Sequence, residues 1–213
     1  MKIKLLFLFL SLGYIGSIYS LDQAPNKMLL RGVRDGDIKL VQEALDKGAN
    51  IDAQDPHEGW SALMIAIDEN KESIAKLLLD KGAKVNLQPS GNNSALSLAA
   101  MNNNTDITNL LLDKGANINI ISRYGFTPLM TAVLNDNLEV ARLLIDRGAS
   151  LYLVNEKREN KTAVDFAKQY SSSILKLIRE KIKKEIVESS SLLPELADIV
   201  SDYLACATGV VEE

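Results

Sequence analysis

The stretch GFTPLMTAVLNDNLEVARLLIDRGAS, residues 125–150, decides the fold of this 213-residue chain. Its last five residues, Asp146-Arg147-Gly148-Ala149-Ser150, have three upstream counterparts, whose glycines are Gly48, Gly82 and Gly115. Successive glycines of this series are 34, 33 and 33 residues apart. Its Thr127-Pro128-Leu129 also recurs at a strict 33-residue step, as Ser94-Ala95-Leu96 and Ser61-Ala62-Leu63. A fixed period of this length indicates a repeat protein, in which each unit buries its apolar surface against its neighbours.

Each repeat is expected to contain two short helices. Thr127 or Ser94 can cap the first helix through its hydroxyl, and Pro128 suits the first helical position. A reversal follows at residue types that tolerate a left-handed conformation, namely Gly36, Asn70, Asn103 and Asp136. In the second helix, the last turn is expected to contain the basic residues Lys47, Lys81, Lys114 and Arg147. The glycine after each of them is expected to end the helix as a left-handed cap.

This pattern resembles the ankyrin repeat, and Gly125-Phe126-Thr127-Pro128-Leu129 is the closest match to it. The resemblance implies an all-α solenoid of about five stacked helix-turn-helix repeats with short β-hairpin-like loops. The predicted domain covers residues 21–187, with repeats at 25–52, 53–86, 87–119, 120–152 and 153–185. The last repeat is stretched by two residues around Glu156–Asn160. Where the family usually has His after Pro-Leu, this chain has Met64, Ser97, Met130 and Asp165, so the family's Thr–His hydrogen bonding is expected to be missing.

Residues 1–20 have the parts of a secretory signal peptide. Lys2 and Lys4 are followed by an uncharged, largely apolar run from Leu5 to Ile18, and small residues lie near its end. We therefore expect cleavage near Ser20, an exported protein and no stable membrane span after removal of the signal. The alternative is an uncleaved N-terminal anchor.

Residues 188–213 are expected to form a C-terminal helix and tail. Pro194 suits the first position of this helix, and its apolar residues fall on one face: Leu193, Leu196, Ile199, Val200, Tyr203 and Leu204. Such a helix is expected to cap the exposed edge of the last repeat. The alternative comes from Leu193-Pro194-Glu195-Leu196 and the apolar pairs after it, which resemble an F-box. That resemblance implies recruitment of a ubiquitin-ligase adaptor.

Composition excludes several functions. The net charge of −4 and the 5% aromatic content argue against a nucleic-acid binder. A single cysteine, Cys206, and a single histidine, His57, leave too few ligands for a Cys- or His-based metal centre. We expect no catalytic site, no metal and no cofactor. An enzyme that uses His57 or Cys206 is the alternative.

The predicted function is binding of another protein through the concave face that loops and first helices form in ankyrin repeats. The export signal and the family together suggest an effector of a host-associated bacterium, acting as a monomer. Aromatic side chains and Arg dominate the binding energy at interfaces, which favours such residues as contacts. For Trp60 and Phe126 the alternative is that the ring packs onto an adjacent loop. The candidate contact residues are His57, Glu58, Trp60, Asp68, Glu69, Ser90, Asn93, Met101, Asn102, Arg123, Tyr124, Phe126, Leu134, Asn135, Arg158 and Lys161.

Overall fold

The computed structural model describes residues 25–89 and 93–189, which belong to two compact units divided after Ser90. The predicted signal peptide (1–20), the candidate contact residue Ser90 and the predicted C-terminal helix that begins at Pro194 lie outside the described residues. The described part is all-α, as predicted. Its β structure consists of two isolated antiparallel bridges, Gln54–Ser61 and Asn155–Lys161, which close two loops in the manner of short hairpins.

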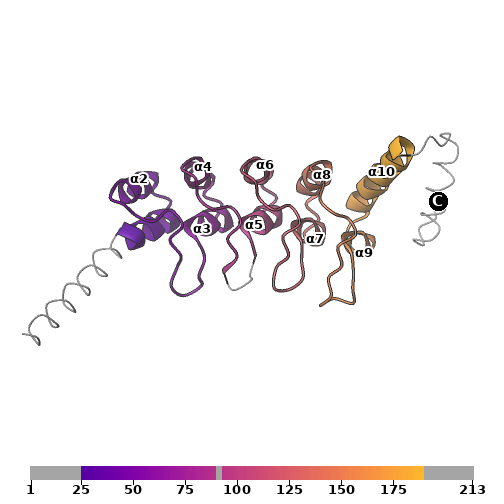
Figure 1. The fold of residues 1–213 in the computed structure, drawn as a ribbon, viewed down its shortest axis with the longest axis horizontal. Coiled ribbons are helices and arrows are strands. Elements are labelled where there is room, and N and C mark those ends of the chain that lie inside the picture. Colours follow the sequence, from indigo (N-terminus) through magenta and orange to yellow (C-terminus); the bar gives the residue numbers. More distant parts are fainter. Residues whose placement is uncertain (1–24, 90–92, 190–213) are drawn as a thin grey trace, which may run out of the picture. The chain divides into compact units, whose positions relative to one another are not determined.

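The first unit begins with a helix over residues 25–35, followed by α2 (Ile38–Asp46), α3 (Ala62–Asp68) and α4 (Glu72–Asp80). Helix α3 packs against α4, and α2 contacts α4 (Figure 1). Backbone-to-side-chain hydrogen bonds also stabilise this unit, one between its first and second repeats and one within the first repeat. Asp52 Oδ1 accepts from the backbone N–H of Lys84 at 2.8 Å, and Asn26 Oδ1 accepts from that of Asn50 at 2.7 Å.

The part of the second unit that the structure describes contains three helix pairs. They are α5 (Ala95–Met101) with α6 (Thr105–Asp113), α7 (Pro128–Leu134) with α8 (Leu138–Asp146), and α9 (Ala163–Tyr170) with α10 (Ser172–Ser189). Helix α7 packs between α5 and α9, while α8 contacts α6 and α10. The first helices of the pairs therefore form one row and the second helices another, and the loops between pairs extend on the side of the first helices (Figure 1).

The first helices are capped as predicted. The hydroxyls of Ser61, Ser94 and Thr127 each accept a hydrogen bond from the backbone N–H three residues on, at 3.1–3.3 Å. Pro128 occupies the start of α7, where no amide donor is needed. These helices end in the predicted left-handed turns, with φ of 55°, 54° and 53° at Asn70, Asn103 and Asp136 and 71° at Gly36.

The position of the usual family His is filled differently in two repeats. Asp165 Oδ2 accepts hydrogen bonds from the backbone N–H and the hydroxyl of Thr162, at 3.0 and 2.7 Å. Those two donors, the N–H first, hold the pKa of Asp165 below its usual value. In another repeat the hydroxyls of Ser94 and Ser97 lie 3.2 Å apart. Side-chain hydrogen bonds to the cap hydroxyl are therefore present in these two repeats, without histidine.

The prediction for the basic residues of the second helices was wrong by one position. Helices α2, α4, α6 and α8 end at an aspartate, so Lys47, Lys81, Lys114 and Arg147 are the C-cap residues and lie just beyond the last turn. The boundary follows from backbone hydrogen bonds, because the C-cap N–H still donates to a last-turn carbonyl group. The predicted glycine caps are present, with φ between 84° and 88° at Gly48, Gly82, Gly115 and Gly148.

Small side chains allow the helices to approach closely. Ala99, Ala100 and Ala132 of the first helices are completely buried, as are Leu111 and Leu144 of the second helices. Asn137 strengthens the stack in the second unit, because its Nδ2 donates to the carbonyl oxygens of Ala100 and Met101 at 2.7 and 2.9 Å. Such bonds occupy carbonyl groups that a helix end leaves without an intrahelical partner.

Helix α10 differs from the other second helices in length. It has 18 residues, whereas α6 and α8 have 9 each. Within residues 25–89 and 93–189, no helix combines the length and apolar character required to cross a membrane.

We predict that Leu111→Ala lowers the free energy of unfolding by about 2–5 kcal/mol, because it leaves a cavity where α6 packs. Leu134→Ala removes the same atoms at the end of α7, where Leu134 is 36% exposed. It should therefore lower the free energy of unfolding far less. Urea denaturation of both variants checks this. Equal losses for the two leucines would contradict the observed packing.

Candidate protein-binding surface

In the first unit, Asp55 shapes the loop that contains three of the predicted contact residues. Its Oδ1 accepts from the backbone N–H groups of His57 and Glu58 at 2.8 and 2.9 Å, and its Oδ2 accepts from Arg34 Nη2 at 2.9 Å. Asp55 is buried, yet its pKa lies below its usual value. The hydrogen bond from the N–H of Glu58 lowers the pKa most, and the N–H of His57 and the charge of Arg34 lower it further. The loop therefore holds a buried carboxylate at its base.

This loop places the predicted residues unequally. His57 and Glu58 are exposed at its tip, while Trp60 is half-buried. Asp68 and Glu69 lie at the end of α3, and the pKa of Asp68 is raised by burial and also by the charge of Glu58. His57, the candidate for an enzymatic role, lies on the exposed tip, and Cys206 lies outside the described residues. Across 25–89 and 93–189, no group of three His, Cys, Asp or Glu residues could hold a metal ion.

In the second unit, Asn155 joins two successive loops. It is completely buried, its Nδ2 donates to the carbonyl oxygen of Tyr124 at 3.1 Å, and its Oδ1 accepts from the N–H of Lys157 at 3.0 Å. Lys157 Nζ also donates to the carbonyl oxygen of Arg123. The loop at 122–126 is thus held against the loop at 155–161. Sequence analysis did not single out Asn155, although Asn at the start of a loop is a typical turn residue.

A pocket of about 420 Å³ lies beside these loops, at the ends of α7 and α9. Its apolar wall consists of Phe126, Leu134, Phe166 and Tyr170. The ring centroids of Phe126 and Phe166 are 5.7 Å apart, and those of Phe166 and Tyr170 are 6.4 Å apart. Its charged side comes from the loop at 155–161 and consists of Lys157, Arg158, Glu159 and Lys161. The Arg158 guanidinium lies 6.0 Å from the centre of the Phe126 ring.

Four of the predicted contact residues meet in this pocket: Phe126, Leu134, Arg158 and Lys161. Phe126 is half-buried, and its ring lies against Phe166 of α9, which is a helix residue and not part of the adjacent loop. The sequence analysis missed Phe166 and Tyr170. Their spacing of four residues in one helix was the available signal, because it places two aromatic rings on the same helix face.

The other predicted residues of the second unit lie outside this pocket. Tyr124 is 52% exposed and carries the Arg123 guanidinium 4.7 Å from its ring centre. Met101 is 37% exposed at the end of α5. Asn93 and Asn102 are half-buried, and Asn135 is exposed at the end of α7.

Gly125 permits the close approach of the two loops. Its φ is +81°, and an added Cβ would overlap Oδ1 of Asn155. Gly148 has a similar φ of +87° but open space around the corresponding position. We predict that Gly148→Ala costs about 1–2 kcal/mol from backbone strain alone. Gly125→Ala should cost about 1–3 kcal/mol more, because Asn155 must move. Urea denaturation compares the two variants, and equal losses would show that the loops do not depend on this contact.

Comparison with known proteins shows which proteins have similar repeats. A family model described as ankyrin repeats (three copies) matches residues 28–122 and 96–188. The human 2-5A-dependent ribonuclease is 40% identical over 58 residues, which are 27% of this chain and 8% of that protein. The "ankyrin repeat, SAM and basic leucine zipper domain-containing protein 1" of Neofelis nebulosa is 35% identical over 66 residues, 31% of this chain and 14% of that protein. This chain therefore spans less than a sixth of the length of either relative. Since the two family matches together cover most of the chain, it belongs to the ankyrin-repeat family.

Proposed function

We propose that this protein binds another protein through the loops and first helices of its second unit. The pocket of Phe126, Leu134, Phe166 and Tyr170 is the main anchoring point in this proposal. The observation that carries it is an apolar line along neighbouring helices. Met101, Leu134 and Tyr170 are the last residues of α5, α7 and α9, and each is at least 36% exposed. Exposed apolar side chains gathered in this way mark interaction surfaces.

The chemistry of the pocket suggests what kind of segment it takes. Its aromatic wall suits an aromatic or large aliphatic side chain. Lys157, Arg158 and Lys161 outnumber Glu159, which already pairs with Lys161 at 3.3 Å. A bound segment should therefore carry an acidic residue next to its apolar one, since complementary charge favours association and fixes orientation.

Selection from a random peptide library tests this surface. Peptides that bind the full-length protein should be enriched in a large apolar residue beside Asp or Glu. Tyr170→Ala should weaken the selected peptides about 10- to 30-fold, which corresponds to about 1.4–2 kcal/mol. Tyr152→Ala removes another exposed tyrosine that does not line this pocket, and it should leave their affinity unchanged. Equal binding by the wild type and Tyr170→Ala would refute the proposed anchor.

We also propose that the protein is exported and acts on proteins of a host. This proposal rests on residues 1–20, where Lys2 and Lys4 precede the uncharged run that ends at Ile18. An exported chain whose repeats bind proteins fits an effector role.

Export predicts a shortened N-terminus. When the full chain is expressed in a bacterium with a general secretion pathway, sequencing of the exported protein should begin at Leu21. Leu8→Arg places a charge in the apolar run and should keep the leader attached, whereas Asn26→Arg, beyond the predicted cleavage site, should not. An intact N-terminus on an exported or membrane-held wild-type chain would support the uncleaved anchor instead.

A further inference from the structure

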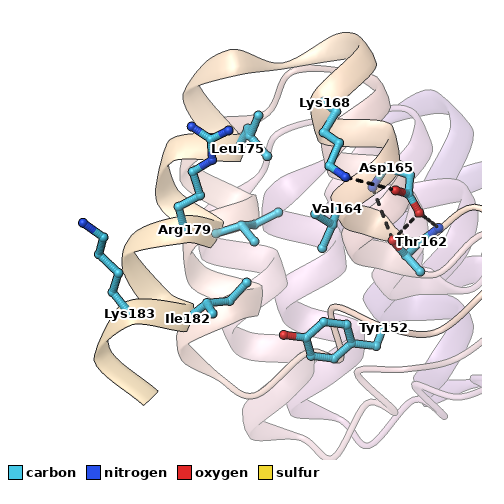
Figure 2. A pocket seen from close by; sticks show the side chains of 10 residues that line it. Tyr152, Thr162, Val164, Asp165, Lys168, Leu175, Arg179, Ile182 and Lys183 are labelled. Atoms are coloured by element: carbon cyan, nitrogen blue, oxygen red, sulfur yellow. Dashed lines mark hydrogen bonds and ion pairs between the residues drawn. The ribbon is translucent and has the colours of Figure 1, made fainter. Parts of the chain in front are cut away.

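A second groove lies between α9 and α10, on the last helix pair that the structure describes. It has a volume of about 280 Å³. Its apolar lining comes from Tyr152, Val164, Leu175, Ile178 and Ile182. The basic residues Lys168, Arg179 and Lys183 lie around it, together with Thr162 and Asp165. Figure 2 shows Leu175 and Ile182 on α10 and Val164 on α9 directed into the space between these helices.

The corresponding surface of the preceding repeats is covered. Val164 is the second residue after its cap residue Thr162, as Leu129 is after Thr127 and Leu96 after Ser94. Leu129 and Leu96 are at most 1% exposed, because α7 packs between α5 and α9. Val164 is only half-buried. The groove is thus the surface on which a further repeat would stack, and its apolar residues favour a cover.

We propose that the chain's own C-terminal segment, Leu193–Leu204, occupies this groove as a helix antiparallel to α10. The length of chain beyond α10 is sufficient. After Ser189 there remain 24 residues, of which residues 190–192 suffice for a short connection. Short connections between helices produce antiparallel neighbours. A 12-residue helix is about 18 Å long, and the groove-lining part of α10, Leu175–Ile182, spans about 10 Å.

The apolar pattern of the segment fits the groove. Leu175, Ile178 and Ile182 are spaced by three and four residues along α10. Leu193, Leu196 and Val200 have the same spacing, and Ile199, Tyr203 and Leu204 extend that face. In the antiparallel arrangement the start of the segment lies beside the last turns of α10, and its later turns lie beside Ile182 and Ile178.

The charges of the two partners are complementary. Residues 190–213 contain five acidic residues, Glu195, Asp198, Asp202, Glu212 and Glu213, and no Lys or Arg. The groove carries Lys168, Arg179 and Lys183 against the single acid Asp165. This complementarity favours the chain's own acidic segment over a second copy of the basic α10 surface.

Docking has a consequence for the F-box-like resemblance. Leu196, Ile199 and Val200, which carry that resemblance, would face the groove. Recruitment of an adaptor would then require the segment to leave α10, so the two roles would compete for the same side chains.

Hydrogen exchange on the full-length protein tests the docking. Leu196→Asp/Val200→Asp places two charges on the apolar face of the segment. Ser201→Asp/Ala205→Asp adds the same charges at the same spacing on the opposite side of the predicted helix. Amides of α10 should exchange at least 10-fold faster in the first variant than in the wild type, and at the wild-type rate in the second. Amides of α5–α8 should be unaffected in both. Unchanged protection of α10 in the first variant would overturn the proposal.

A disulfide test separates the possible occupants. The antiparallel arrangement places the native Cys206 near the start of α10, close to Lys168. Under mild oxidation, Lys168→Cys should form a disulfide with Cys206 within one chain, and the matched variant Lys184→Cys, toward the other end of α10, should form much less. Disulfide-linked dimers of Lys168→Cys would show that a second copy fills the groove. No disulfide in either variant, or equal amounts in both, would refute the antiparallel arrangement.

Discussion

The structure depends on one constraint: a pair of short helices cannot bury its own apolar surface. Ordering about 33 residues costs about 30–60 kcal/mol of backbone conformational entropy, whereas each buried Leu contributes only about 1.5–3 kcal/mol. In the second unit, α7 meets the constraint by packing between α5 and α9, which buries Leu129 completely. The last described pair meets it only in part, because Val164 remains half-buried. The groove beside α10 is a direct result.

The same packing produces the candidate binding surface. The first helices of the second unit are short, and the last residue of each described one is an exposed apolar residue, such as Leu134 or Tyr170. The loops that precede α7 and α9 are held together by the buried side chain of Asn155, which makes hydrogen bonds to both. Hydrogen-bonded loops beside exposed apolar residues make a surface whose side chains can vary without loss of the fold. The family scaffold therefore does not identify the partner.

Local features were predictable because they depend on neighbouring residues. Thr127 as a cap, Pro128 at a helix start and Asn70 in a left-handed turn follow from the chemistry of those side chains. The misplaced residues at the helix ends show the limit of such reasoning. Whether Lys47 belongs to the last turn depends on one backbone hydrogen-bond pattern, and a periodic sequence does not specify a boundary to one residue.

Contacts between repeats were harder to predict from the sequence. Phe126 and Phe166 are 40 positions apart across a repeat with extra residues, so their rings could be paired only once the loops had been placed. The hydrogen bond from Thr162 to Asp165 takes the place of the Thr–His bond that the sequence analysis expected to be missing. The sequence by itself determined the repeat, its caps and its turns, because a 33-residue period repeats the same local interactions. The tertiary structure decided which side chains meet in the pocket and where apolar surface remains uncovered, because both depend on how neighbouring repeats pack.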